Sequence, residues 1–526
     1  MEQKAITIIT GQSGVEIKEC IKKLGLAYLS VEGRMSDISK TPFQEILTLP
    51  LRKQYDLWAT AFQDLSAKGE LSPTTMLTFH SAYYHQNKKE LFCPVNTRLL
   101  AEKLEYRVKR IIVFIDDLYD VYRRLMDAGE MFEYILNKRK TSSEQAIYES
   151  IVNIIFLLNW REMEICISRL LANFLSAEFF VVATKHPTFM IKKLIESPTD
   201  ALNIYYLSHP ISIIRKESRD TLSPFVGELN SFVRNILKYD DNILFLPTSI
   251  DELRIKTSLM RKKLKKKPIE IYEPILSPRW ASPYPDDSLL APELPKGTAN
   301  IEPFNPQNHK LKRSESTTIS GLLSTIKSLI HEKQIMSRDF SLVEQSNNGI
   351  IAVRPYFQGD RSDGMMGEIT HNSSLMGKQT KRKCYVLSTD KDEENHQIYK
   401  ILTHLEFKKD STEFEEKRKE LIRNKFSLEN LSDEEIVAKI EKEVVPPGYD
   451  WTNGFETDKW TGDYLAKKEK AKKQIFEKIL QALKCNEIQH TIHSDGRESA
   501  LQYLTLKENG FWEQAPTELN KILRGV

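Results

Sequence analysis

An apolar run near residue 350 restricts the fold of this 526-residue chain more than any other stretch. The run is Gly349-Ile350-Ile351-Ala352-Val353, and its β-branched content predicts a buried strand. A helical segment precedes it. A Gly-containing loop at 362–367 and a further helix follow it, before a second apolar run at 384–387. Helix, strand, loop, helix and strand in this order predict a βαβ unit with parallel strands.

Two carboxylates flank this predicted strand. Asp339 lies in the helical segment before it, and Glu368 lies at the start of the helix after the loop. Ligands of open α/β sheets bind at the carboxyl ends of the strands, so we expect both acids to face that crevice. Each acid alone has an ordinary explanation. A glutamate after a Gly-rich loop is commonly a first-turn residue favoured by the helix dipole, and a single aspartate is commonly solvated.

Further motifs surround these acids in a defined order. They are Arg338-Asp339, Gln345-Ser346-Asn347, the apolar run 350–353, Ser362-x-Gly364-x-x-x-Glu368, and Gly377-Lys378 before Tyr385-Val386. In this order they resemble the nucleoside 2-deoxyribosyltransferases and their hydrolytic relatives, the 2'-deoxynucleoside 5'-phosphate N-hydrolases. The resemblance extends back to the segment 204–210, IYYLSHP, which is similar to the family's first strand and its tyrosine.

The resemblance implies a Rossmann-like (flavodoxin-like) parallel sheet and a set of catalytic roles. Glu368 matches the family's nucleophile, Asp339 its partner in base departure, and Tyr205 the residue that positions the nucleophile. Glycosidic chemistry requires such a pair of carboxylates, because one attacks the anomeric carbon while the other protonates or orients the leaving group.

The same resemblance implies how the substrate is held. Ser362 and the amides near Gly364 are expected to bind a 5'-phosphate or hydroxyl, since a Gly turn at a helix start binds anions. His209 and Arg215 follow the first strand and are expected to add charge-assisted contacts. The Ser-x-Gly-x-x-x-Glu spacing favours the phosphate-using hydrolase, while a transferase that needs an acceptor base stays open. Cleavage requires no cofactor, no metal site is expected, and the resemblance implies a homo-oligomer.

The amino-terminal segment predicts a separate α/β domain. Residues 4–10 read as an apolar strand, a Gly loop follows at 11–15, and a helix continues beyond it. This setting resembles the phosphate-binding P-loop of kinases and related ATPases, whose amides and lysine cradle phosphates. Glu16-Ile17-Lys18 stands where Gly-Lys-Ser belongs, so the lysine is displaced by one position, and no serine or threonine is placed for magnesium.

A run that looks like a Walker B strand lies further along the chain. It spans residues 110–117 and ends in two acids, and residues 177–184 read as a later strand of the same sheet. The candidate nucleotide-binding residues are Gly11, Gly14, Lys18, Asp116 and Asp117. A working loop would bind ATP with magnesium. The acid at position 16 repels a triphosphate, so we expect the fold to be kept and nucleotide hydrolysis to be lost.

These segments divide an α/β chain into three regions. Residues 1–197 are predicted as a degenerate P-loop NTPase-like domain, similar to nucleotide kinases, and residues 203–390 as the deoxyribosyltransferase-like domain. The second domain carries a basic, Pro-rich insert at about 258–318. Residues 391–526 are charged and are predicted to form a helical C-terminal region.

The composition restricts the partners and the compartment. The net charge is +3, which gives no case for a polyanionic partner, so we expect no nucleic acid ligand. The five cysteines are dispersed without metal-ligand spacing, as is typical of a reducing cytosol. The sequence shows no secretory signal pattern and no apolar stretch of about 18 residues that would span a membrane. We therefore expect a soluble, cytoplasmic protein.

Three functions are consistent with these patterns. The first is an enzyme that cleaves or transfers the N-glycosidic bond of a nucleoside or nucleotide. The second is a nucleotide kinase or ATPase that uses the first domain. The third is a non-catalytic nucleotide-sensing protein that acts with a partner. The ordered acids at 339 and 368 favour the first, and the altered loop at 16–18 disfavours the second.

Overall fold

The computed structural model places the described residues of the protein in two compact units. The first unit is Met1–Tyr206 with Ile214–Asn348, and the second is Leu207–Ile213 with Gly349–Val526. The described residues are 5–67, 71–72, 75–85, 87–88, 90–103, 107–127, 143–209, 224–239, 241–250, 254–258, 271–275, 335–354, 363–376, 382–389, 501–506 and 511–524. Most of the predicted insert at 258–318, and residues 390–500, lie outside them. The domain limits predicted from the sequence stay a prediction.

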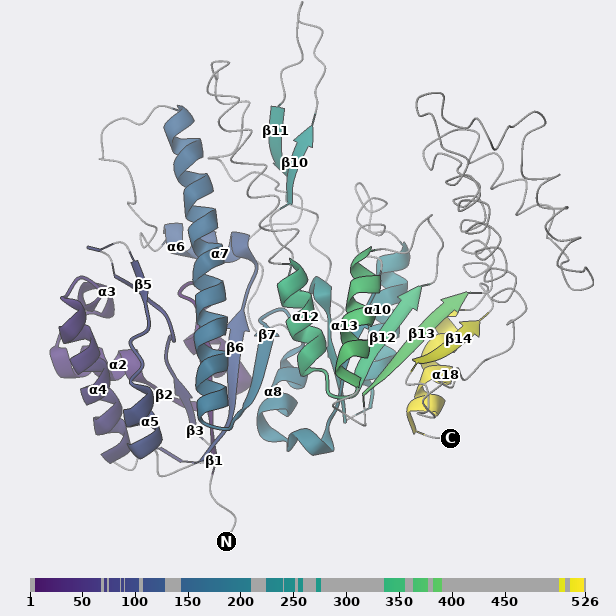
Figure 1. Ribbon diagram of the computed structural model, residues 1–526, viewed down its shortest axis with the longest axis horizontal. Coiled ribbons are helices and arrows are strands. Elements are labelled where there is room, and N and C mark those ends of the chain that lie inside the picture. The colour runs from purple at the N-terminus through teal and green to yellow at the C-terminus, as the bar shows by residue number, and fades with distance from the viewer. Residues whose placement is uncertain are drawn as a thin grey trace, which may run out of the picture. The chain divides into compact units, whose positions relative to one another are not determined.

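A five-stranded sheet forms the centre of the first unit (Figure 1). Its order is β2-β3-β1-β6-β7, and every neighbouring pair is parallel. The strands are β1 (Ala5–Gly11), β2 (Ala27–Ser30), β3 (Thr75–Thr78), β6 (Arg107–Ile115) and β7 (Glu178–Ala183). The three apolar runs predicted as strands at the amino terminus, before the paired acids and at 177–184 are β1, β6 and β7.

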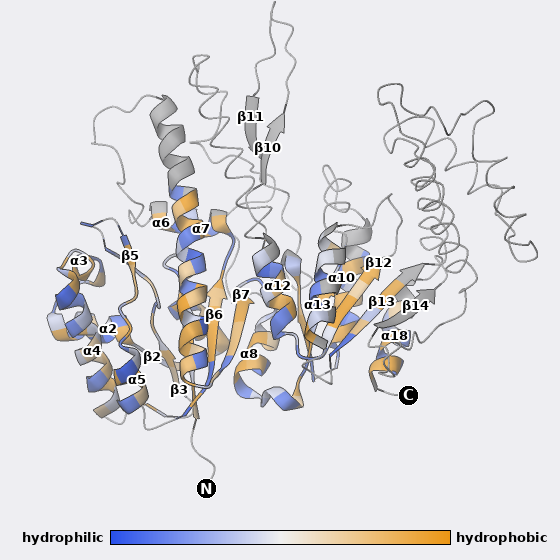
Figure 2. Ribbon diagram, in the orientation of Figure 1, coloured by the Kyte–Doolittle hydropathy of each residue, from blue (hydrophilic) through white to orange (hydrophobic). Residues whose placement is uncertain are grey.

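Helices and one hairpin accompany this sheet. They are α1 (Ile17–Leu24), α2 (Val31–Ser39), α3 (Phe43–Ile46), α4 (Leu51–Ala67), β4 (Tyr83–His85), β5 (Glu90–Phe92), α5 (Thr97–Lys103), α6 (Leu118–Asp127), α7 (Ser143–Phe174), α8 (Thr188–Glu196) and the 3-10 turn η1 (Thr199–Ala201). Strand β1 is buried continuously from its second residue. Successive side chains of a strand point to opposite faces, so a continuous buried run means that both faces of the sheet are covered. Figure 2 shows the same apolar character along β6 and β7.

A second five-stranded sheet has the order β14-β13-β12-β8-β9. Its strands are β8 (Asn203–Ser208), β9 (Asn242–Phe245), β12 (Gly349–Arg354), β13 (Lys383–Thr389) and β14 (Leu501–Leu506). The division between the two compact units passes through β8. Strand β12, helix α13 (Asp363–Met376) and strand β13 follow one another, and the two strands pair in parallel. The βαβ unit predicted from the sequence is therefore confirmed.

Strand β14 differs from the helical region predicted after residue 390, but, among the described residues, only at 501–506. Residues 501–506, LQYLTL, pair in parallel with β13, from Cys384 opposite Leu501 to Thr389 opposite Leu506. The segment is short and rich in residues that favour strands, and its charged surroundings mask that signal. Helix α18 (Phe511–Arg524) follows it.

The remaining described elements belong to the first unit. They are α10 (Pro224–Leu237), the 3-10 turn η2 (Pro247–Ser249), the antiparallel pair β10 (Arg254–Ser258) and β11 (Ile271–Ile275), and α12 (Ile335–Gln345). Helix α12 carries Arg338 and Asp339, and its last residue binds the edge of the first sheet. The Gln345 side-chain amide accepts from the Val181 N–H at 2.7 Å and donates to the Val181 carbonyl at 2.8 Å. It therefore satisfies the backbone of edge strand β7 as a neighbouring strand would.

The structure is thus an α/β protein with two parallel-sheet cores, as the sequence predicts at that level. Within the described segments, no helix has both the length and the apolar character needed to cross a bilayer.

Candidate active site

The candidate nucleophile lies beside the carboxyl end of a strand in the second unit. Glu368 is in α13, the helix that follows β12, and its side chain is buried. Ser208 is the last residue of β8 and is fully buried. The Ser208 hydroxyl donates a short hydrogen bond to Oε2 of Glu368. This contact gives the Glu368 carboxylate a fixed partner at the strand end. The family resemblance did not single out Ser208.

The other residues predicted for this site fall into three groups. Tyr205 lies within β8 and His209 follows it directly, and both are buried. Gly364 is exposed in the first turn of α13. Ser362 and Arg215 lie outside the described residues. The predicted grip on a 5'-phosphate therefore stays a prediction.

Asp339 lies in the first unit, where it is bound by the arginine before it. Nε and Nη2 of Arg338 both donate to Oδ1 of Asp339, at 3.0 and 2.9 Å, and Nη2 also donates to the Pro247 carbonyl at 3.3 Å. Both side chains are buried. A buried charge is tolerated only when it is paired and hydrogen-bonded, and this pair meets that condition. The guanidinium stabilises the ionised carboxylate, so Asp339 is an acceptor in this structure.

The loop that the sequence analysis compared with a P-loop follows β1 in the first unit. Gly14 has φ +84°, and a Cβ there would lie 3.1 Å from side-chain atoms of Val121 and Leu125, so the loop lies close against α6. Glu16 is exposed in a left-handed conformation with φ 54°. Ile17 opens α1 with its side chain buried, whereas Lys18 is exposed. The position where a P-loop would carry its lysine is thus occupied by a buried isoleucine.

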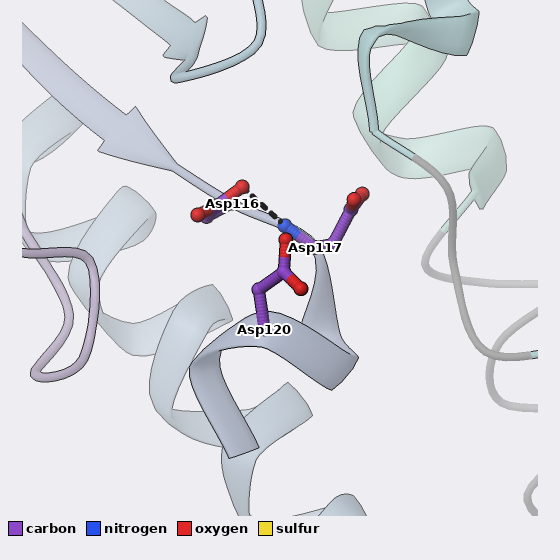
Figure 3. A group of neighbouring side chains, drawn as sticks. All are labelled: Asp116, Asp117 and Asp120. Atoms are coloured by element: carbon purple, nitrogen blue, oxygen red, sulfur yellow. Dashed lines mark hydrogen bonds between the residues drawn. The ribbon is translucent and has the colours of Figure 1, made fainter. Parts of the chain in front are cut away.

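Three aspartates gather where β6 meets α6 (Figure 3). They are Asp116, Asp117 and Asp120, all buried, and their ligand atoms lie within 4.8 Å of one another. The sequence had singled out the first two as the end of a Walker B-like strand. Figure 3 shows the hydrogen bond from the Asp117 N–H to Oδ1 of Asp116, which is 2.8 Å long.

Two cations already bind this cluster. Nζ of Lys185 lies 2.6 Å from Oδ1 of Asp116 and 2.8 Å from Oδ2 of Asp120. Nη1 of Arg124 lies 2.8 Å from Oδ2 of Asp116 and donates to the Gly14 carbonyl at 2.8 Å. Burial would raise the pKa of Asp116, but Lys185 and Arg124 outweigh it and lower the pKa to about 2. Since side-chain cations hold both Asp116 oxygens, this arrangement does not fit a magnesium site.

A buried glutamate binds the backbone amide at the start of the loop. Glu164 of α7 accepts from the N–H groups of Gly11, Ser81 and Ala82, at 3.1, 2.7 and 2.8 Å. Burial raises the pKa of Glu164 to about 7, while His80 and the backbone donors act in the opposite direction. The first amide of the predicted phosphate cradle thus has a carboxylate partner within the protein.

Sequence reasoning missed Ser208, Arg124, Lys185 and Glu164. Ser208 and Lys185 carried a usable signal, because each lies at or just after the carboxyl end of a predicted strand, where ligands of α/β sheets bind. Glu164 lies in the middle of a long helix, and nothing local distinguishes it. No family model matches the sequence, and no curated protein matches it.

Proposed function

We propose that the protein cleaves or transfers the N-glycosidic bond of (deoxy)nucleosides or nucleoside 5'-monophosphates, with Glu368 as the nucleophile. The observation that carries the proposal is the buried Glu368 carboxylate held by the Ser208 hydroxyl at the carboxyl end of β8. Burying a carboxylate costs free energy. A buried carboxylate beside the ligand-binding edge of a parallel sheet therefore favours a chemical role for Glu368 over that of an ordinary surface acid. The reaction class is proposed from the order of the sequence motifs around Glu368, which resembles that of the deoxyribosyltransferases and the related N-hydrolases.

The reaction has two steps. A lone pair on a Glu368 carboxylate oxygen forms a bond to C1' of the sugar, and the electron pair of the C1'–N bond leaves with the base, which takes up a proton from solvent water. In the second step a water oxygen attacks C1', the water gives a proton to Asp339, and the electrons of the ester bond return to Glu368. A base in place of water at this step gives transfer instead of hydrolysis.

Asp339 serves the departing base in this proposal. Its ion pair with Arg338 favours the charged carboxylate, which suits an acceptor more than a proton donor. We therefore assign it to orient the base by accepting a hydrogen bond, and to accept the water proton in the second step. Tyr205 is proposed to position the nucleophile, as the family resemblance implies.

Recognition of the 5' end is proposed to lie at the loop before α13. Ser362 and the Gly364 amide would hold a phosphate, and His209 and Arg215 would add charge-assisted contacts. Binding energy at this remote group lowers the barrier only for substrates that carry it. A monophosphate that is cleaved faster than its nucleoside would therefore support the hydrolase, and a free nucleoside used best with an added base would support the transferase.

The alternative functions rest on the first sheet. A kinase or ATPase requires a lysine in the loop and free acids for magnesium, and the buried Ile17 and the Lys185–Asp116 ion pair count against both. A non-catalytic, nucleotide-sensing protein that acts with a partner remains the second candidate. Under this alternative the second unit would bind the nucleotide without cleaving it.

The test is incubation of the full chain with deoxynucleoside monophosphates, nucleosides and NAD, with free base measured by chromatography. Each substrate is run with and without a second base as acceptor. We expect base release from at least one deoxynucleoside or its monophosphate without added metal. Absence of release from every substrate, with and without acceptor, would favour the non-catalytic alternative.

A further inference from the structure

We propose that Ser208 is a positioning residue for Glu368, and that its hydroxyl keeps this carboxylate ionised and oriented for attack. The inference rests on the proposed function. Both residues belong to the second compact unit, and they are 160 positions apart in the sequence. Since a carboxylate can only accept, the short hydrogen bond between them is a donation from Ser208 to Oε2.

The location of Ser208 makes it suitable for this role. It is the last residue of β8, so its main chain is fixed by the strand, and its side chain has a single carbon between the backbone and the hydroxyl. It is fully buried, and Glu368 is 6% exposed. A donor with so little conformational freedom holds its acceptor with little entropy loss on substrate binding.

The contact has two chemical consequences. Burial favours the neutral form of a carboxyl group, which cannot attack, and a donor to the charged form opposes this effect. The bond to Oε2 also limits rotation about the last bond of the Glu368 side chain, which sets the direction of Oε1 toward the sugar. In the second step the charge returns to Glu368, and the same hydroxyl stabilises the carboxylate as a leaving group.

A structural role for Ser208 makes a different prediction. A serine that only fills space at the strand end would affect stability when it is replaced, but it would not affect the rate at which Glu368 becomes glycosylated. The discriminating measurement is therefore the rate of covalent labelling, separated from substrate affinity.

The experiment uses 2-deoxy-2-fluoroarabinosyl nucleosides and their 5'-monophosphates, whose fluorine slows hydrolysis of the covalent intermediate. Labelling is followed by intact mass and located by peptide mapping. In the wild-type protein we expect an adduct on Glu368, and none in Glu368→Gln. Ser208→Ala should label about 10- to 100-fold more slowly, the scale of a hydrogen bond to a charged group, with a half-saturating probe concentration within about twofold of wild type.

Matched variants separate the hydroxyl from packing. Ser208→Thr keeps the hydroxyl donor. Ser208→Val has nearly the same shape as Ser208→Thr but lacks the hydroxyl, so this pair remains informative if Ser208→Ala does not fold. We expect Thr to label faster than Val by about the same 10- to 100-fold. Ser249→Ala removes another buried serine hydroxyl, one that donates to the Leu246 carbonyl at 2.6 Å, and should label at the wild-type rate.

The outcomes separate the two claims. Labelling of Glu368 at equal rates in wild type, Ser208→Ala and the Thr and Val pair would overturn the role of Ser208 and leave the proposed function intact. No labelling and no base release by the wild-type protein would overturn the proposed function, and the role of Ser208 with it. Slow labelling of Ser208→Ala and Ser208→Val, with recovery in Ser208→Thr, is the expected result.

Discussion

Nζ of Lys185 lies between two carboxylates, 2.6 Å from Oδ1 of Asp116 and 2.8 Å from Oδ2 of Asp120. This ion pair occupies the carboxyl end of β6, where a working P-loop domain holds magnesium. The ammonium neutralises charge that a metal would otherwise neutralise, so we expect this ion pair to stabilise the fold.

Lys185→Met should therefore destabilise the protein strongly. Removing one partner leaves buried carboxylates short of countercharge, which typically costs about 3–5 kcal/mol. The free energy of unfolding is measured in urea at neutral pH. Lys192→Met is the control, because Lys192 pairs with Glu196 only at 3.9 Å on the surface and should change stability by less than about 0.5 kcal/mol. Equal stability of Lys185→Met and wild type would contradict the structural role.

The same ion pairs predict an acid dependence of stability. The pKa of Asp116 is lowered to about 2 from its ordinary value of 3.8, because the attraction of Lys185 and Arg124 outweighs the effect of burial. A lowered carboxyl pKa contributes stability above the unfolded value, and that stability is lost as the pH falls toward the folded value. The contribution is about 2 kcal/mol. Between pH 5 and pH 2 the free energy of unfolding should fall more steeply for wild type than for Asp116→Asn. An equal pH dependence of the two proteins would sink this prediction.

Binding of nucleoside triphosphates by the first domain should be weak or absent. Ile17 is buried where a loop lysine is needed, and Arg124 holds the Gly14 carbonyl. Calorimetry with ATP and magnesium checks this directly, and Lys18→Ala should behave as wild type does because Lys18 is exposed. Tight, magnesium-dependent binding that disappears in Lys18→Ala would mean that Lys18 has taken over in a shifted register.

Gly349→Ala tests the start of β12. Gly349 has φ +105°, and a Cβ there would lie 1.8 Å from the Lys383 carbonyl oxygen, so both the backbone and the neighbouring strand exclude a side chain. Gly25→Ala is the matched control, because Gly25 has φ +69° with open space around its Cβ position. We expect a loss of about 1 kcal/mol for Gly25→Ala, from backbone strain alone, and a several-fold larger loss for Gly349→Ala. Similar losses of free energy of unfolding in the two variants, measured in urea, would show that the neighbouring strand moves to make room for the side chain.

Local pattern was enough for most strands of the two five-stranded sheets, but not for β2 and β3, and it gave no access to long-range contacts. The apolar runs of β1, β6, β7, β12 and β13 are read directly because buried parallel strands are continuously apolar. Strand β14 was missed, since its pairing with β13 joins segments more than a hundred residues apart in the sequence and its charged surroundings suggested helix.

The same limit applies to the site residues. Glu368 stands in a local motif and was identified, whereas its donor Ser208 is 160 positions away. Lys185 is 69 positions from Asp116, so the two-acid run alone gave no sign that a lysine neutralises it. A side chain at the end of another strand can be identified as a binding partner only when the sheet order is known, because the order decides which strand ends lie next to each other.

The most direct test of the account is base release by Glu368→Gln. The amide has nearly the same shape as the carboxylate but carries no negative charge, so it cannot act as the anionic nucleophile. Glu196→Gln, the same substitution at an exposed position on α8, is the control. We predict that Glu368→Gln folds with an unchanged circular dichroism spectrum and releases no base from the best wild-type substrate, while Glu196→Gln retains full activity. Wild-type turnover by folded Glu368→Gln would contradict the assignment of Glu368 as the nucleophile.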